Sequence, residues 1–167
     1  EMAAVGFRNI EECHKQYKRF DRVICVSETV RKVFIKSIGK IDEKKVKVLY
    51  NTNETEEILE KSKEKITDVK FDKSVVNMCS VAKIMKTKGF DRLARVHNQL
   101  LKEGYKEHIY ILGIGEEQGK IEKYLQENDL VDSFTFLGYR DNPYKYVANC
   151  DLYVCSSRRE GFSTAVT

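Results

Sequence analysis

Several features that define other protein classes are missing from this sequence. Among its 167 residues there are one proline and no tryptophan, and no apolar run approaches the roughly 20 residues that cross a bilayer. The N-terminal region lacks the apolar centre of a signal peptide. The five cysteines are an odd number without the paired short spacing of a zinc site. We therefore expect reduced thiols, no bound metal and a cytoplasmic protein.

The sequence also lacks a strong excess of charge of either sign. The 30 Lys and Arg residues outnumber the 26 Asp and Glu residues only slightly, for a net charge of +4, and the two kinds interleave without a basic arm. This pattern argues against a nucleic-acid partner. The chain contains 9 Tyr and 8 Phe, and 41% of its residues are hydrophobic, which indicates a folded globular protein rather than a disordered one.

The sequence does contain a regular alternation of short apolar runs and longer amphipathic stretches. The apolar runs are rich in β-branched and aromatic residues, which predicts strands over residues 22–26, 46–50, 75–81, 108–112, 134–137 and 151–155. Helical spacing and capping residues predict helices over residues 28–37, 54–66, 90–101, 116–128 and 143–147. Such alternation predicts an α/β fold, a Rossmann-like parallel sheet with helices on both faces. The Lys-rich residues 61–73 are expected to form a solvated helix end and loop.

Ligands bind beyond the carboxyl ends of parallel strands, so the loops after the strands are the candidate sites. In the loop after the third run, Lys83 and Lys88 are five positions apart, and Gly89 precedes a helix. Two ammonium groups and a helix N-terminus could converge on a diphosphate. A solvated basic turn explains the same residues, and the spacing alone leaves both readings open.

The next two loops begin with glycine. Gly113-Ile-Gly115 is similar to a dinucleotide fingerprint, but the third glycine comes one residue late and no acidic residue ends the next strand. A tight strand-to-helix turn and a close approach to a ligand both account for it. Gly138 permits a sharp turn after which the backbone of Tyr139 and Arg140 could face a planar base. A turn built from Gly, Asn and Pro is the alternative.

The loop after the sixth run carries Glu160, followed by Gly161, Phe162 and Ser163 at what resembles a helix start. The backbone N–H groups of these three residues would point into the crevice. A carboxylate beside them suits sugar hydroxyls better than a phosphate, which it would repel. An ordinary acidic residue in a first helical turn is the alternative.

In order and spacing, these loops match a known pattern. The matching segments are Val81-Ala-Lys-Ile84, Lys88-Gly-Phe-Asp91, Ile111-Leu-Gly-Ile-Gly-Glu116, Phe136-Leu-Gly-Tyr139 and Ser157-Arg-Arg-Glu-Gly-Phe-Ser163. Together they resemble the donor-binding half of a family 4 glycosyltransferase, and Cys25-Val-Ser-Glu28 resembles the end of that family's acceptor-side domain. The resemblance implies the GT-B fold and a fragment of a longer protein. Residues 1–45 would be the end of the N-terminal acceptor-side domain and hinge, and residues 46–167 an incomplete C-terminal nucleotide-sugar-binding domain.

The resemblance also implies a reaction. The family transfers a sugar from a nucleotide-diphospho-sugar, commonly a UDP- or GDP-sugar, to an acceptor hydroxyl with retention of configuration and without a metal or other cofactor. Lys83 and Lys88 match the positions that stabilise the leaving diphosphate, and Glu160 matches the first carboxylate of the family's two-glutamate motif, so these are the expected catalytic residues. The expected donor-binding residues are Lys83, Lys88, Gly113, Gly138, Tyr139, Arg140, Gly161, Phe162 and Ser163.

The sequence departs from the family's pattern at defined positions. Ala82-Lys83 stands where the family usually has Gly-Arg, and lysine cannot form the bidentate fork of arginine. The second glutamate of the motif would follow Thr167. No histidine of this sequence matches the catalytic histidine of the acceptor-side domain, and His97 and His108 are expected to be structural.

The implied partners are a nucleotide-sugar donor and a glycan, lipid-linked or small-molecule acceptor, in polysaccharide or glycan assembly. Any membrane contact would be made by parts outside this sequence, and the oligomeric state stays open. The fragment alone is expected to be inactive because the other wall of the cleft is missing. Two alternatives stay open, a non-catalytic nucleotide-binding or assembly module and a GT-B-fold nucleotide-sugar epimerase.

Overall fold

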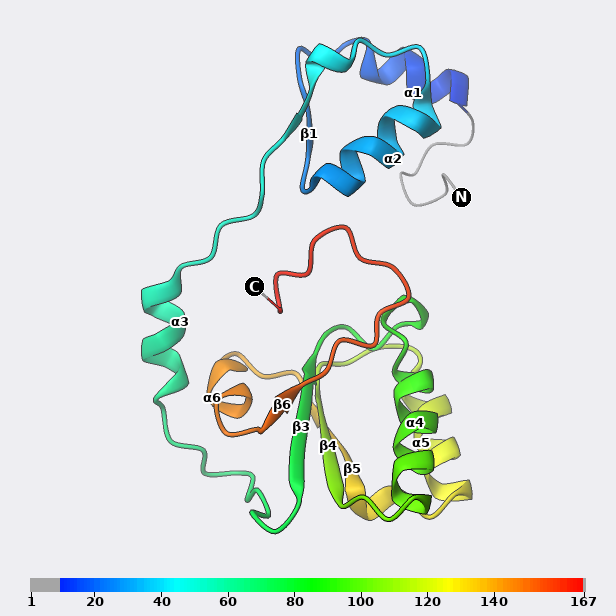
Figure 1. The fold of residues 1–167 in the computed structure, drawn as a ribbon. Coiled ribbons are helices and arrows are strands. Elements are labelled where there is room, and N and C mark those ends of the chain that lie inside the picture. The colour runs from blue at the N-terminus through cyan, green and yellow to red at the C-terminus, as the bar shows by residue number, and fades with distance from the viewer. Residues whose placement is uncertain (1–9, 167) are drawn as a thin grey trace. The chain divides into compact units, whose positions relative to one another are not determined.

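The computed structural model describes residues 10–166 of the chain. These residues form two compact units (Figure 1). The first unit comprises residues 10–53 together with residues 161–164, and the second comprises residues 54–160 together with residues 165–166. Within the described residues, no helix is both long and apolar enough to span a membrane.

The first unit is a small α/β element. Its regular segments are α1 (Ile10–Tyr17), β1 (Val23–Cys25), α2 (Glu28–Ile38), the 3-10 helix η2 (Glu43–Lys45) and β2 (Val46–Val48). Strands β1 and β2 pair in parallel, with Val23 opposite Val46. Helix α2 begins after Ser27, whose hydroxyl accepts a hydrogen bond from the backbone of Val30, as expected for an N-cap.

The second unit contains the main sheet. Its segments are α3 (Thr55–Ser62), β3 (Val76–Val81), η3 (Lys86–Lys88), α4 (Phe90–Lys102), β4 (Glu107–Leu112), α5 (Gln118–Glu127), η4 (Val131–Ser133), β5 (Phe134–Gly138), α6 (Tyr144–Val147) and β6 (Leu152–Tyr153). The strand order is β5-β4-β3-β6, and every pair is parallel. All six predicted strands are present.

Each face of this sheet is covered by its own apolar cluster. Ile109 and Ile111 of β4 pack with α4 and α5 on one face, and Tyr110 and Leu112 pack with α6 on the other. Because successive residues of a strand point to opposite faces, β4 must be apolar throughout to fill both clusters. Full burial of each large aliphatic side chain stabilises the fold by roughly 1.5–3 kcal/mol. The predicted Rossmann-like fold, a parallel sheet with helices on both faces, is therefore confirmed.

The structural boundary between the two units differs from the domain boundary that we predicted from the sequence. The compact units divide after Asn53, whereas the sequence placed the boundary between residues 45 and 46. The difference arises because β2 pairs with β1 and not with the main sheet. The functional identities assigned to the two ranges stay predictions.

The Lys-rich residues 61–73 are not simply a solvated loop, so that expectation was wrong in part. Ile66, Val69 and Phe71 pack against the apolar cluster on the α6 face, and the ring of Phe71 lies 4.8 Å from that of Tyr110. Lys63, Lys65, Lys70 and Lys73 are exposed, while the apolar residues between them cover this face of the sheet. Lysine enrichment concealed the apolar positions in the sequence.

A buried polar pair links α4 to β4. His97 and Glu107 have almost no exposed surface, and Nδ1 of His97 lies 3.1 Å from Oε1 of Glu107 while Nε2 lies 2.8 Å from Oγ of Ser133. Burial lowers the pKa of His97 to about 4 and raises the pKa of Glu107, because each charged form is poorly solvated there. The His97 imidazole is therefore neutral at pH 7, and the pair has a structural role.

Candidate functional site

The candidate site lies at the carboxyl ends of the main-sheet strands. Because β3, β4, β5 and β6 are parallel, the loops that follow them leave the same edge of the sheet. These loops contain Lys83 and Lys88 after β3, Gly113 after β4, Tyr139 and Arg140 after β5, and Glu160 after β6. The sequence therefore placed these residues on the correct edge.

The loops after β3 and β4 are packed directly on each other. The backbone N–H of Ile84 donates to the carbonyl of Ile114 over 2.9 Å, and that of Glu117 donates to the carbonyl of Ile84 over 3.2 Å. A Cβ atom on Gly113 would lie 2.0 Å from the carbonyl oxygen of Ala82, and one on Gly115 would lie 2.1 Å from that of Ile84. The close approach of the two loop backbones thus requires glycine at both positions. This favours the interpretation of the segment as a tight strand-to-helix turn.

A β-bulge changes the direction of the chain at the end of β5. Ile111 pairs with Phe136, but Leu112 pairs with Gly138, so Leu137 is the extra residue. Gly138 then adopts a φ of 74°, in the left-handed region that favours glycine, and its carbonyl accepts a hydrogen bond of 2.8 Å from Gly113. The bulge and turn direct Tyr139 out of the sheet edge.

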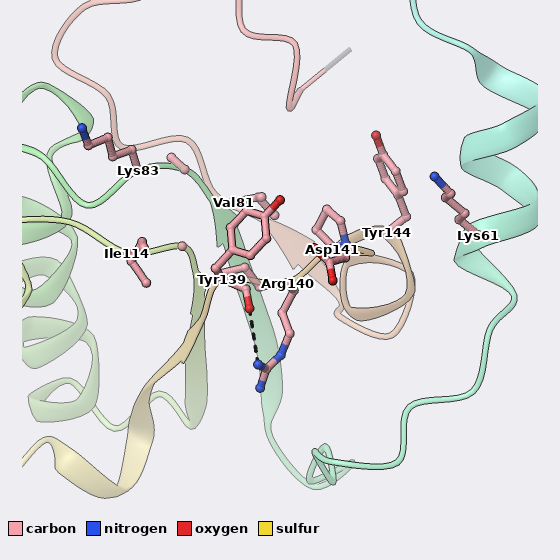
Figure 2. A pocket seen from close by; sticks show the side chains of 12 residues that line it. Lys61, Val81, Lys83, Ile114, Tyr139, Arg140, Asp141 and Tyr144 are labelled. Atoms are coloured by element: carbon pink, nitrogen blue, oxygen red, sulfur yellow. Dashed lines mark hydrogen bonds between the residues drawn. The ribbon is translucent and has the colours of Figure 1, made fainter.

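A pocket of about 640 Å³ opens between these loops (Figure 2). It is lined by Lys61, Val81, Ala82, Lys83, Leu112, Gly113, Ile114, Tyr139, Arg140, Asp141, Pro143 and Tyr144. Tyr139 is 67% exposed and Ile114 is 59% exposed, so both present apolar surface to solvent at the pocket. A concave apolar surface of this size with a few polar groups is typical of small-molecule sites.

The side chain of Arg140 does not reach toward the open side of this pocket. Figure 2 shows it running away from the Tyr139 ring and the Tyr144 hydroxyl. Its guanidinium lies 3.0 Å from Asp68 and 5.7 Å from the centre of the Tyr146 ring. The phenol of Tyr146 also donates to Asp68 over 2.9 Å, and burial with this carboxylate raises the pKa of Tyr146. Arg140 therefore anchors the loop, and only its backbone and stem remain for contact with a ligand.

Lys83 has the most accessible cation among the predicted site residues. Its side chain is exposed at one end of the pocket, and Figure 2 shows its ammonium on the side to which Tyr139 and Tyr144 also point. No hydrogen bond or ion pair joins this ammonium group to another residue in the described part of the chain. An anion can therefore bind it without displacing a protein partner.

Lys88 and Glu160 form an ion pair. Nζ of Lys88 lies 2.7 Å from Oε1 of Glu160, and each side chain is 28% exposed. The hydroxyl of Ser157 donates to the same oxygen over 2.6 Å. The Lys88 ammonium and the Ser157 hydroxyl lower the pKa of Glu160, so its carboxylate is ionised at neutral pH. Neither Lys88 nor Glu160 is among the residues that line the pocket.

The remaining predicted residues, Gly161, Phe162 and Ser163, belong to the first unit. The Ser27 hydroxyl donates to the carbonyl of Gly161 over 2.9 Å, and the ring of Phe162 lies 5.9 Å from that of Tyr50. The expected helix start is wrong for the described residues, because residues 161–166 form a bend and a turn. The proposed role of these three residues in donor binding stays a prediction.

Sequence reasoning missed the pocket wall formed by α3. Lys61 lines the pocket because Asn142 donates to its carbonyl over 2.8 Å and Lys145 pairs with Glu64 at 3.6 Å, which fixes α3 beside α6. Nothing in the sequence near Lys61 signals this contact, because Asn142 is more than 80 positions away. Pro143 and Tyr144 were assigned only to a turn and a short helix, although both contribute to the pocket.

A parallel α/β sheet with candidate ligand-binding loops at its carboxyl edge defines a broad class of proteins with Rossmann-like domains. The model of the family described as glycosyl transferases group 1 matches residues 61–167, which is more than half of the chain. The chain belongs to this family.

Two curated relatives agree with this assignment. The chain is 34% identical over 126 residues to the N-acetylgalactosamine-N,N'-diacetylbacillosaminyl-diphospho-undecaprenol 4-alpha-N-acetylgalactosaminyltransferase of Campylobacter jejuni, covering 75% of this chain and 32% of the relative. It is 24% identical over 156 residues to an uncharacterized glycosyltransferase of Methanocaldococcus jannaschii, covering 92% of this chain and 38% of the relative. The chain thus spans about a third of the length of these relatives.

Solved structures share the fold. A mutant of TarM from S. aureus, crystallised with fondaparinux, alpha-GlcNAc-glycerol and UDP, superposes with a TM-score of 0.69 at 20% identity, over 93% of this chain and 28% of TarM. Anabaena HepE in complex with UDP-glucose gives a TM-score of 0.69 at 18% identity, over 95% of this chain and 45% of HepE. At 18–20% identity, these superpositions show a shared fold.

Proposed function

We propose that this chain is the donor-binding part of a retaining, family 4 type glycosyltransferase. The protein would transfer a sugar from a nucleotide-diphospho-sugar to an acceptor hydroxyl. The observation that carries the proposal is the pocket at the carboxyl ends of β3, β4 and β5, where an exposed aromatic ring, an exposed aliphatic side chain and an unpaired lysine surround one concavity.

The pocket offers different surfaces to the parts of a nucleotide. Tyr139 and Ile114 present apolar surface that a planar base would cover, and their high exposure is then relieved on binding. The Lys83 ammonium at the end of the pocket suits a phosphate. The UDP in the TarM crystal and the UDP-glucose in the HepE complex support a uridine nucleotide as the first ligand to test.

The ion pair beside the pocket supplies the proposed chemistry. When the bond between sugar and diphosphate breaks, negative charge grows on the leaving diphosphate, and Lys83 and Lys88 would stabilise it without a metal. Glu160, ionised through its contacts with Lys88 and Ser157, would accept hydrogen bonds from the sugar hydroxyls. Gly161, Phe162 and Ser163 would contribute backbone donors to the same ligand.

The acceptor is proposed from the relatives. The Campylobacter relative is named for a diphospho-undecaprenol-linked acceptor, and the TarM mutant was crystallised with alpha-GlcNAc-glycerol. We infer a glycan or lipid-linked acceptor in glycan assembly for this protein. Both names contain an alpha-linked sugar, which fits retention from a donor whose own sugar is alpha-linked.

Calorimetric titration of the protein with UDP, GDP, UDP-sugars and GDP-sugars tests the donor site. We expect one nucleoside diphosphate and its sugars to bind, with Tyr139→Ala weakening every nucleotide that carries the preferred base. Failure of all these ligands to bind would contradict the proposal. Incubation of the full-length protein with the preferred donor, with and without acceptor, then separates transfer from epimerisation, because epimerisation needs no acceptor.

A further inference from the structure

Arg158 and Asp91 form a bidentate ion pair next to the proposed diphosphate site. Nη1 of Arg158 lies 2.7 Å from Oδ1 of Asp91, and Nη2 lies 2.7 Å from Oδ2. This is the parallel fork geometry that gives arginine–carboxylate pairs their directionality. The pair joins the loop after β6 to the first turn of α4, 67 positions away in the sequence.

Arg158 also holds the turn that carries Lys88. Its Nη1 donates to the carbonyl of Lys86 over 2.6 Å, and its backbone N–H donates to the carbonyl of Thr87 over 2.7 Å. The contacts therefore fix the residues immediately before Lys88, while Asp91 lies three residues after it. Arg158 itself is two residues before Glu160.

A second set of contacts ties the same two loops together. The hydroxyl of Ser156 donates to the carbonyl of Lys88 over 2.8 Å, and Arg92 donates to the carbonyl of Ser156 over 2.7 Å. Gly89 permits this approach, because a Cβ atom there would lie 2.2 Å from the Ser156 carbonyl oxygen. The backbones that carry Lys88 and Glu160 are thus held from both sides.

We propose that Arg158 and Asp91 are positioning residues that set the distance between Lys88 and Glu160 for the donor diphosphate and its sugar. The inference rests on the proposed function, because it assigns Lys88 to the diphosphate. A displacement of about 1 Å at such a site can reduce a rate about 100-fold. Loss of the fork would let the loop after β6 shift relative to η3 and would weaken the grip on the diphosphate.

Stability and ligand selectivity separate this positioning role from a merely structural one. The side chains of Arg158 and Asp91 are 31% and 37% exposed, and ion pairs in such positions contribute little to stability. Variants of the pair should therefore stay folded. They should lose affinity for UDP but not for UMP, because the two ligands share the base, the ribose and the first phosphate and differ in the second.

The test is calorimetric titration of wild type, Arg158→Gln and Asp91→Asn with UDP and with UMP, or with GDP and GMP if wild type prefers GDP. We expect the affinity for the diphosphate to fall about tenfold and that for the monophosphate to stay within about twofold. The double variant should be no weaker than Arg158→Gln alone, since Arg158→Gln already removes the interaction that Asp91→Asn removes. Arg95→Gln and Asp132→Asn are the matched controls, since both side chains are exposed and make no hydrogen bond or ion pair with the described residues.

The possible outcomes distinguish a positioning role from a merely structural one, and both from a failure of the proposed function. Equal diphosphate affinity in wild type and variants, or a parallel loss of both ligands, would overturn the positioning role while leaving the donor site intact. Absence of nucleotide binding in wild type would overturn the proposed function and, with it, this inference. If Arg158→Gln does not fold, Arg158→Lys replaces it, with the same expected diphosphate-specific loss because lysine keeps the charge but not the fork.

Discussion

The Lys88 ammonium lies 2.7 Å from the Glu160 carboxylate, although the two residues are 72 positions apart. They meet because β3 and β6 are neighbours in the sheet and their following loops leave the same edge. In this arrangement Glu160 already satisfies the Lys88 charge. In the proposed function, a diphosphate that binds Lys88 would compete with Glu160 for it, and the Glu160 carboxylate would then become available to a sugar hydroxyl.

This competition gives the first prediction. Glu160→Gln should bind UDP more tightly than wild type, because the variant removes a negative charge and releases Lys88, yet it should be slower in sugar transfer. Calorimetry measures the first effect and a transfer assay on the full-length protein measures the second. Weaker UDP binding by Glu160→Gln would show that the ion pair does not compete with the nucleotide.

The Lys83 ammonium has no such partner among the described residues, so its removal should lower the affinity for the ligand directly. Lys83→Ala should lose a charged hydrogen bond to phosphate, which costs about 1.5–3 kcal/mol, or roughly 10- to 100-fold in UDP affinity. Lys102→Ala on the exposed side of α4 is the matched control and should bind UDP as wild type does. Unchanged affinity in Lys83→Ala would remove this residue from the site.

The loop glycines give a prediction about stability. Gly115→Ala would place a Cβ atom 2.1 Å from the Ile84 carbonyl oxygen, and such overpacking costs at least about 1–3 kcal/mol. Gly119→Ala, four residues later and inside α5, meets no atom within 4 Å and should stabilise the helix by about 0.5–1 kcal/mol. Urea unfolding of both variants distinguishes them, and a stable Gly115→Ala protein would contradict the loop packing described.

The buried histidine predicts a dependence of stability on pH. The pKa of His97 is about 4 in the folded protein and about 6.5 when unfolded, so its contribution is complete above pH 6.5 and is lost as the pH falls toward 4. Between pH 7 and pH 5 this group should lower the free energy of unfolding by up to about 2 kcal/mol. The raised pKa of Glu107 acts in the opposite direction and offsets part of this loss.

The measurement for this prediction is the NMR titration of the His97 imidazole, together with urea unfolding at both pH values. The imidazole should remain neutral at pH 5. His97→Asn should show a smaller loss of stability between pH 7 and pH 5 than wild type. A His97 that titrates near pH 6.5 in the folded protein would refute its burial as a neutral group.

The sequence predicted the strands and the edge of the sheet that carries the site, because both follow from local patterns. Every strand has an apolar run, and Lys83, Tyr139 and Glu160 follow runs that pair in parallel. The pocket wall at Lys61 and the Arg158–Asp91 fork depend on contacts between segments 67 or more positions apart, which no local pattern encodes. The residue pattern after Glu160 predicted a helix start at Gly161 and its neighbours, but Ser27 and Tyr50 contact them in the first unit instead.

The central claim is that the pocket between the loops after β3, β4 and β5 binds the nucleotide. Amide NMR spectra of the protein titrated with UDP test it most directly, with GDP as the second ligand. We predict the largest chemical-shift changes at Lys83, Gly113, Ile114, Tyr139 and Arg140. Changes confined to other parts of the chain, or no changes with either ligand, would contradict it.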